Sequence, residues 1–218
     1  MTLTATIKDS GDDVVCVHEK AGKRDTFRVS LKDFIASISA INIDVECEYH
    51  EPIGEIPEDV VSIRLAKNSL LFSAKILIKR KAGPVFYNYG GNVFKVPMPE
   101  LLFDLHIKEG QVDTARTKIY AVNGNKELCA YPYTNVYADA HICWGSLRIP
   151  KVANVKDSVK ILDFFLAAEN NSDLTQNFSL EAMGVATTHA LLMAMKKEKV
   201  FKDEWLKPLG GITIDALI

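Results

Sequence analysis

Residues 133–145 read YTNVYADAHICWG, and this stretch places Cys143 eight residues after Asn135. A free cysteine in an apolar stretch usually packs as a small hydrophobic side chain. A thiol held at a fixed distance from a side-chain amide has a second use, because the thiol can attack a carbonyl and the amide can stabilise the resulting oxyanion. Whether Cys143 is a buried core residue or a nucleophile depends on the rest of the sequence.

The composition indicates a folded protein with a sizeable core. The chain has 218 residues, of which 48% are hydrophobic and 25% are charged. That suffices for one generous domain, or for a core domain with a small added lobe. The formal charge is −2 and no basic block stands out. A nucleic-acid partner is not expected, because such binding usually needs clustered Lys and Arg.

The sequence predicts a cytoplasmic protein with reduced thiols. Its start, MTLTATIKDSGDDVV, has neither the basic nor the apolar region of a secretory signal. The longest apolar stretch, SLLFSAKILI at 69–78, is too short to span a membrane and contains Lys75. The cysteines are too few and too scattered for a disulfide framework. They are Cys16, Cys47, Cys129 and Cys143.

The first part of the chain predicts a small lobe made of a hairpin and a helix. Residues 13–29 form two β-rich runs around a turn at 21–23. Residues 31–41 have an amphipathic helical pattern, with Ser30 as the N-cap.

A domain boundary is expected in HEPIGEIPED at 50–59, where breakers and charges gather. The predicted organisation is a small lobe at 1–57 and a core domain at 58–218.

The middle of the chain predicts β structure. The β-rich runs are VVSIRLA at 60–66, LLFSAKILIKR at 70–80, GPVFYNY at 83–89, TKIYAV at 117–122 and KELCAY at 126–131. In KVPMPELLFDLHI at 95–107, two prolines favour an extended approach to another strand. We expect the strands of residues 60–131 to form one antiparallel meander.

After Cys143 the pattern becomes helical, which makes the fold class α+β. Residues 154–169 predict a helix capped by Asn154. The face expected to pack beside the sheet consists of Val155, Val159, Leu162 and Leu166. A second helix is predicted over 179–199.

The Asn135–Cys143 spacing, on a loop between a β-meander and a helix, resembles that of ubiquitin-conjugating enzymes, in which a His-Pro-Asn motif precedes the catalytic cysteine. The segments VPMPELLF at 96–103 and NVYADAHICWG at 135–145 are similar in particular to prokaryotic ubiquitin-conjugating-enzyme-like family D, also described as PRTRC system protein B. The resemblance covers residues 60–170. It implies a ubiquitin-conjugating-enzyme-like (UBC) fold, to which the N-terminal hairpin and helix would be an addition.

The resemblance implies an enzyme that carries a ubiquitin-like protein as a thioester and passes it to an amine, in a bacterial, plasmid-borne PRTRC-type system. Cys143 would be the nucleophile and Asn135 the oxyanion donor, while Asp173 is the nearest candidate for the acid that helps to deprotonate the incoming amine. The residues expected to shape the site are Tyr133, Thr134, Trp144 and Gly145. The implied partners are a ubiquitin-like modifier, a ThiF-like adenylating enzyme and a JAB-type metallopeptidase, and no cofactor is implied.

The His and Pro of the eukaryotic-type motif are replaced here by Tyr133 and Thr134. This departure keeps a second function class open, a non-catalytic binding module of the same fold that holds a modifier or another partner. The presence of Cys143 at the family's offset favours the enzyme.

Other Cys, His and Gly groups have structural interpretations. A zinc site is not expected, because the sequence lacks the paired spacing of zinc ligands. The groups weighed were Cys129 with His141 and Cys143, Cys16 with His18, and Cys47 with His50. His189 is expected to lie in the core. Gly210-Gly211 resembles a modifier tail, but because ITIDALI follows it, we expect a helix-ending turn there.

Overall fold

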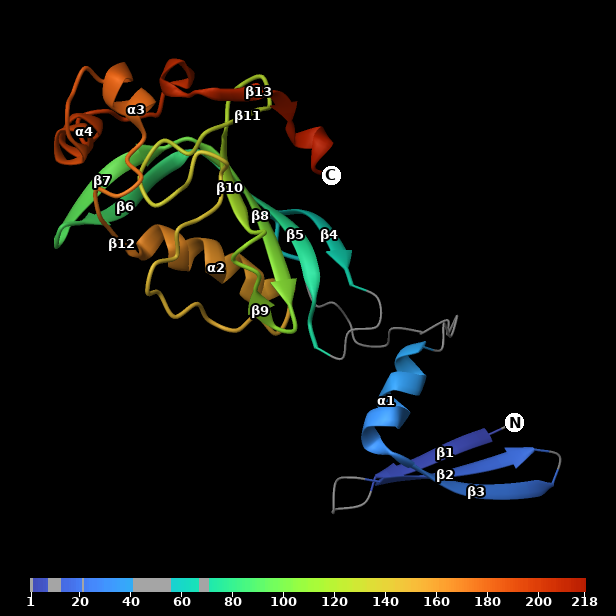
Figure 1. The fold of residues 1–218 in the computed structure, drawn as a ribbon. Coiled ribbons are helices and arrows are strands. Elements are labelled where there is room, and N and C mark those ends of the chain that lie inside the picture. The colour runs from blue at the N-terminus through green and yellow to red at the C-terminus, as the bar shows by residue number, and fades with distance from the viewer. Residues whose placement is uncertain (1, 8–12, 21, 41–55, 67–70) are drawn as a thin grey trace. The chain divides into compact units, whose positions relative to one another are not determined.

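The computed structural model describes residues 2–7, 13–20, 22–40, 56–66 and 71–218. The chain divides into two compact units, Met1–Glu51 and Pro52–Ile218 (Figure 1). The expectations that concern Ala21, Cys47, His50 and residues 51–55 lie outside the described residues.

The first unit contains a three-stranded antiparallel sheet and one helix. Its elements are β1 (Thr2–Ile7), β2 (Asp13–Lys20), β3 (Lys23–Ser30) and α1 (Leu31–Ala40). The predicted hairpin is β2–β3, and β1 adds a strand that the sequence had not indicated, in the order β1-β2-β3. Ser30 caps α1 as expected, because its hydroxyl accepts from the Asp33 N–H at 3.0 Å.

The second unit is built on a twisted antiparallel sheet in the order β13-β11-β10-β8-β5-β4, with β9 paired to β8 (Figure 1). Its strands are β4 (Val60–Leu65), β5 (Ala74–Arg80), β8 (Glu100–Lys108), β9 (Gln111–Val112), β10 (Lys118–Val122), β11 (Glu127–Cys129) and β13 (Pro208–Thr213). We call it the larger sheet.

A smaller sheet corrects the prediction of a single meander. It consists of β6 (Gly83–Tyr89), β7 (Asn92–Met98) and β12 (Glu169–Asn170), in the order β12-β6-β7, and β12 runs parallel to β6. The chain leaves β7 and enters β8 across Pro99. Because proline has no N–H to donate to a ladder, the segment 95–107 changes sheets there instead of forming one strand.

Four helical segments lie between β11 and β13, and a fifth follows β13. They are α2 (Val155–Ala167), α3 (Asn177–Ala182), α4 (Thr188–Met195), η1 (Asp203–Trp205) and η2 (Ile214–Ala216). The Asn154 side chain caps α2 as predicted, accepting from the Asp157 N–H at 2.9 Å. The single helix predicted over 179–199 is wrong, because Gly184 has a positive φ of 61° and Thr187 caps a new helix through the Ala190 N–H.

The larger sheet has apolar clusters on both faces. The inner face and α2 form the main core, with Val155, Leu162 and Leu166 buried as predicted and Val159 only half-buried. The outer-face cluster consists of Leu77, Leu102, Tyr120, Val122, Leu128, Ala140 and Ile214. Ile214 belongs to residues 208–218, which we call the C-terminal segment.

The C-terminal segment corrects the expectation for Gly210-Gly211. Both glycines have positive φ, 75° and 74°, but they lie within β13, where the pairing with β11 is irregular between Glu127 and Cys129. A strand bulge, rather than a helix-ending turn, therefore explains the glycine pair. Among the described residues, no helix is long and apolar enough to cross a membrane.

Candidate functional site

The quoted stretch folds into a short hairpin, residues 135–143, which we call the site hairpin. Val136 and Ile142 form an antiparallel bridge. The Cys143 N–H donates to the Asn135 carbonyl at 2.8 Å, so the two predicted site residues face each other across the hairpin. Its turn closes where the Ala140 N–H donates to the Tyr137 carbonyl at 2.9 Å.

The two faces of the site hairpin differ in burial. Val136 and Ile142 are buried in the main core. Cys143, Asn135 and His141 are half-buried, and Tyr137 is 47% exposed. Because side chains alternate between the faces of a strand, these outward residues share one face. The cysteine is thus presented to solvent by a hairpin whose other face is anchored in the core.

Tyr137 contacts the candidate nucleophile. A hydrogen bond with the Cys143 side chain is the largest cause that raises the pKa of the Tyr137 phenol. A phenol is neutral at pH 7 even at its ordinary pKa of about 10, so Tyr137 can donate to the sulfur. Tyr137 lies across the hairpin from His141, whose carbonyl accepts from the Tyr137 N–H at 2.8 Å.

Asn135 is held by a directed hydrogen-bond network centred on buried Asn170 of β12. The Asn170 Nδ2 donates to the carbonyls of Ala168 at 2.9 Å and Asn88 at 3.2 Å. Its Oδ1 must therefore be the acceptor, and it accepts from the Asn135 Nδ2 at 2.9 Å. A primary amide has two N–H bonds, so Asn135 keeps one donor for a further acceptor.

The network continues from Asn170 into the smaller sheet. The Thr134 hydroxyl donates to the same Asn170 Oδ1 at 3.3 Å. The Tyr87 hydroxyl lies 2.6 Å from the Thr134 Oγ1 and accepts from the Thr134 N–H at 3.2 Å. Since the Thr134 proton is used on Asn170, the Tyr87 hydroxyl donates to Thr134. Burial raises the pKa of Tyr87 to about 12, which keeps this donor protonated.

The two ends of the site hairpin are anchored in the core by the buried side chains of Tyr133 and Trp144. Tyr133 is buried, its hydroxyl donates to the Pro97 carbonyl at 2.6 Å, and its ring lies 5.1 Å from that of Tyr87. Trp144 points into the core and meets the Phe165 ring of α2 edge-on at 5.8 Å. The exposed Gly145 has a positive φ of 52° and turns the chain after Trp144.

Asp173 approaches the site through its backbone. Its carbonyl accepts a long contact of 3.5 Å from the Asn135 N–H. Its exposed carboxylate accepts from the Asn171 side chain at 2.9 Å. The structure therefore brings Asp173 next to Asn135, with its carboxylate engaged in its own loop.

A carboxylate–imidazole pair that the sequence had not indicated lies at the tip of the site hairpin. The His141 Nδ1 lies 2.8 Å from the Asp139 Oδ2. The hydrogen bond from His141 is the largest cause that holds the pKa of Asp139 below its usual value, and the charge of Lys118 acts in the same direction. Asp139 is thus an anion that orients the imidazole.

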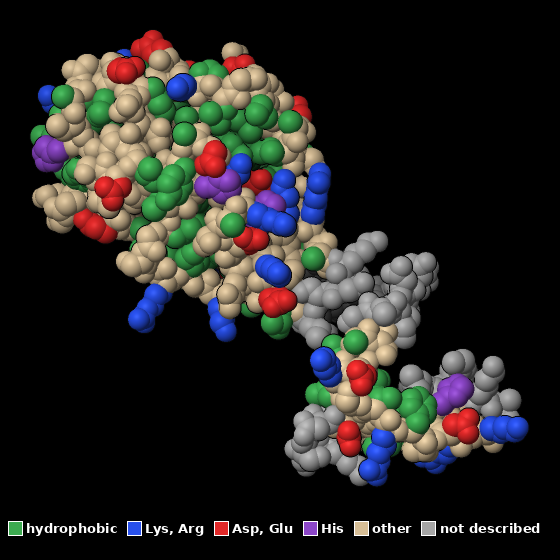
Figure 2. Space-filling model, in the orientation of Figure 1, with side chains coloured by type: hydrophobic (Ala, Val, Ile, Leu, Met, Phe, Trp, Pro, Cys, Tyr) green, Lys and Arg blue, Asp and Glu red, His purple; other side chains and the backbone are tan. Residues whose placement is uncertain are grey.

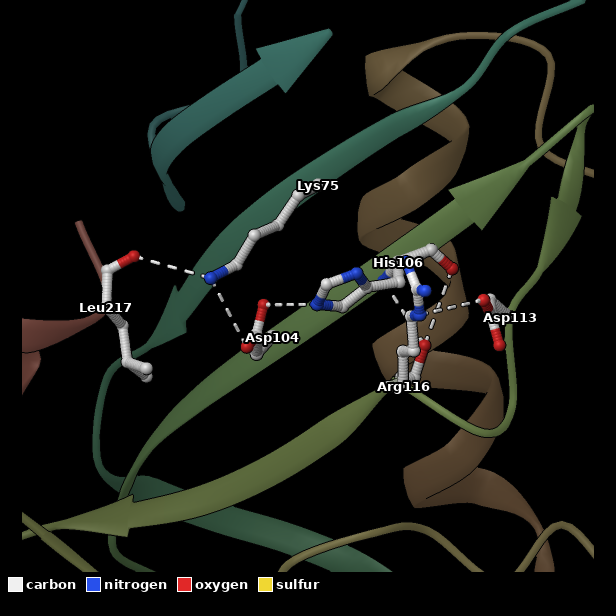
Figure 3. Close-up of polar contacts among 7 residues, drawn as sticks. Lys75, Asp104, His106, Asp113, Arg116 and Leu217 are labelled. Atoms are coloured by element: carbon white, nitrogen blue, oxygen red, sulfur yellow. Dashed lines mark hydrogen bonds and ion pairs between the residues drawn. The ribbon is translucent and has the colours of Figure 1, made fainter. Parts of the chain in front are cut away.

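The outer face of the larger sheet carries a further polar cluster (Figure 3). The Lys75 Nζ of β5 lies 3.6 Å from the Oδ2 of buried Asp104 on β8 and donates to the Leu217 carbonyl at 3.4 Å. The His106 Nε2 lies 3.3 Å from the Asp104 Oδ1. Figure 2 shows basic, acidic and histidine side chains gathered over this part of the larger unit. Within the described part of the chain, no group of three or more His, Cys, Asp or Glu residues could hold a metal ion.

Some site residues could have been found from the sequence and others could not. Alternation within residues 135–143 places Tyr137 and His141 on the face of Cys143, and that signal is visible in the quoted stretch. Nothing in the sequence around Asn170 indicated its role. That role depends on the pairing of β12 with β6, which lies more than eighty positions earlier in the chain.

The chain combines an α+β fold with a cysteine opposite an asparagine on a hairpin before a helix, which is compatible with an E2-like protein. The sequence profile of prokaryotic E2 family D matches residues 72–209. The chain belongs to this family, as the resemblance in its sequence indicated, and the match includes the whole site hairpin. A search of curated proteins and a search of solved structures found no match. Family membership supports an E2-like role in general.

Proposed function

We propose that this protein is a ubiquitin-conjugating-like acyl transferase, which carries a ubiquitin-like protein as a thioester on Cys143 and passes it to an amine. The observation that carries the proposal is the Cys143–Asn135 pairing. The thiol is partly exposed on a core-anchored hairpin, and the amide opposite it has one N–H left after bonding to Asn170.

The proposed reaction has two balanced steps. The Cys143 thiolate attacks the adenylated C-terminal carboxyl group of the modifier, and AMP leaves as the thioester forms. An amine then attacks the thioester carbonyl, and the remaining Asn135 N–H donates to the tetrahedral oxyanion. The amine nitrogen gives up one proton to a base, and the Cys143 thiolate leaves as the amide forms. One such donor is typically worth about 10²–10³ in rate.

The missing His-Pro pair does not remove a group that this chemistry needs. Tyr133 stands in the motif's first place and is fixed by the Pro97 carbonyl and by aromatic neighbours. Thr134 is fixed by Tyr87 and Asn170. These contacts support the proposal because they give Asn135 a rigid base by other means.

The proposed partners are a ubiquitin-like protein and a ThiF-like adenylating enzyme, with a JAB-type metallopeptidase in the same PRTRC-type bacterial system. We place the reaction in the cytoplasm, where thiols stay reduced.

The test is a loading assay with the two proposed partners, the ubiquitin-like protein and the ThiF-like adenylating enzyme, in the presence of ATP. We expect an adduct one modifier heavier that a thiol reductant cleaves, because thioesters exchange with thiols and amides do not. Cys143→Ala should form no adduct. Cys16→Ala, Cys47→Ala and Cys129→Ala serve as matched controls and should load normally.

Two outcomes would contradict the proposal. A thiol-sensitive adduct that persists in Cys143→Ala would move the nucleophile elsewhere. If the wild type binds the modifier but never forms a covalent adduct, the protein is instead a binding module for a ubiquitin-like protein.

A further inference from the structure

The site hairpin presents a second functional group on the same face as Cys143. His141 lies two positions before Cys143, so the two side chains project from the same side of the strand, roughly 7 Å apart at their bases. The His141 Nδ1 is occupied by the Asp139 carboxylate at 2.8 Å. The Nε2 is therefore the nitrogen available for proton transfer.

Charged and titratable groups from two elements lie beside this imidazole among the described residues. Asp139, Tyr137 and Cys143 belong to the site hairpin itself. Lys118 of β10 pairs directly with His141 as an isolated bridge.

Two further groups lie behind this first set. The backbone of Lys118 pairs in register with that of Asp104 on β8. Burial is the largest cause that raises the pKa of Tyr120, and the charges of Asp104 and Asp139 act in the same direction. Asp139 is therefore the carboxylate in contact with the imidazole.

Aminolysis of a thioester needs a proton acceptor near the sulfur. The attacking amine becomes positively charged as its nitrogen bonds to the carbonyl carbon, and the departing thiolate needs a proton. The carboxylate of Asp173 is engaged by Asn171. Among the described residues, the His141 Nε2 makes no side-chain hydrogen bond, and His141 shares the face of Cys143.

We propose that His141, oriented by Asp139, is the proton acceptor for the amine that attacks a thioester on Cys143. This inference rests on the proposed function. In the step, the amine nitrogen bonds to the carbonyl carbon, His141 takes the proton from nitrogen, the carbon–sulfur bond breaks, and the proton passes to the leaving thiolate. His141 is the catalytic residue, and Asp139 is a positioning residue that keeps Nδ1 protonated and Nε2 as the acceptor.

The test separates acyl transfer from loading by an adenylating enzyme. The other cysteines are changed to alanine, Cys143 is acetylated with a small acetyl thioester, and the single acetyl group is verified by mass spectrometry. Methoxyamine then serves as the nucleophile, because it remains unprotonated across the pH range used. The rate of acetyl loss is measured against pH for the wild type and the variants.

We expect His141→Gln to slow methoxyamine discharge by about 10²–10⁴, the usual worth of a general base, and to remove the limb of the pH–rate profile that depends on the imidazole. Asp139→Asn should slow discharge less and change the shape of the same limb. Added imidazole should restore part of the rate in His141→Ala, which a merely structural role would not allow. His189→Gln is the matched control and should discharge at the wild-type rate. The prediction that His189 lies in the core is wrong, because the residue is exposed on α4 and only its ring packs edge-to-face against Phe94.

The outcomes are distinguishable. A Cys143 that takes up no acetyl group overturns both the proposed function and this inference. A wild type that discharges normally while His141→Gln discharges equally fast overturns only the role of His141. A collapse in Asp173→Asn with His141→Gln unchanged would assign the proton transfer to Asp173 instead.

Discussion

The hydrogen-bond network behind Asn135 can be tested by a double-mutant cycle at Asn170 and Thr134. Asn170→Leu removes an amide that bonds four groups. The Asn88 carbonyl and the Asn135 amide belong to half-buried residues and can turn to water. The Ala168 carbonyl and the Thr134 hydroxyl belong to residues that are 9% and 1% exposed. The carbonyl therefore loses its donor and the hydroxyl proton loses its acceptor, although the Thr134 oxygen still accepts from Tyr87.

The expected cost follows from that count. At about 1–3 kcal/mol for each buried polar group left unpaired, Asn170→Leu should lower the free energy of unfolding by about 2–6 kcal/mol. Thr134→Val leaves only the proton of the buried Tyr87 hydroxyl without an acceptor, at about 1–3 kcal/mol. The double variant no longer contains the orphaned Thr134 hydroxyl, so its cost should fall below the sum of the single costs by about 1–3 kcal/mol.

The assay is urea unfolding followed by tryptophan fluorescence and circular dichroism. Asn171→Leu is the matched control, because Asn171 is exposed and adjacent, and it should change the free energy of unfolding by about 0.5 kcal/mol or less. Strictly additive costs for Asn170→Leu and Thr134→Val, or equal costs for Asn170→Leu and Asn171→Leu, would refute the network.

Further predictions concern chemistry, titration and packing. Asn135→Ala should load with modifier but discharge to lysine about 10²–10³ more slowly in a quenched-flow assay, and equal discharge rates would contradict its role. Tyr87, whose pKa is raised to about 12, should stay neutral in an ultraviolet titration well above pH 10; stability from its neutral form is complete below the ordinary tyrosine pKa and is lost as the pH rises toward 12. Carbon-detected NMR should find the pKa of Asp139 lowered in the wild type and raised again in His141→Gln; the matching contribution to stability is present above the ordinary Asp pKa and is lost as the pH falls through the lowered value. Ile214→Ala should destabilise by about 2–5 kcal/mol if the outer-face cluster is packed as described, and an unchanged urea midpoint would argue against that packing.

Local signals in the sequence predicted local structure well. Ser30 and Asn154 cap their helices as their residue types indicate, because capping depends on a few neighbouring atoms. The family was indicated by the segments 96–103 and 135–145, and the α+β class by β-rich runs followed by helical patterns, while the positions of the site hairpin residues depended on short-range spacing in residues 133–145. That spacing is sufficient for a hairpin whose partners are eight residues apart.

Features set by distant pairing were not predictable in the same way. The two prolines of residues 95–107 predicted an extended approach to another strand, and only the structure shows that Pro99 separates two sheets. Gly184 fell within a convincing helical pattern, yet its positive φ ends α3. Asn170 and the Gly210-Gly211 bulge acquire their roles from strands far away in the chain, and no local pattern reports such a partner.

The C-terminal segment has a consequence for the order in which this protein folds. Lys75 reaches the Leu217 carbonyl and Arg64 reaches the Ile218 carbonyl, contacts that join residues 142 and 154 positions apart. Such long loops carry a high entropic cost of closure and form late. During synthesis, the outer-face cluster therefore stays exposed to solvent until the C-terminal segment is made. The main core can assemble earlier, because α2 has already been synthesised. A nascent chain that stalls at residue 209, where the family match ends, lacks most of the C-terminal segment. It would leave Leu77, Leu102 and Tyr120 exposed to chaperones and proteases, while the site hairpin stays anchored in the main core.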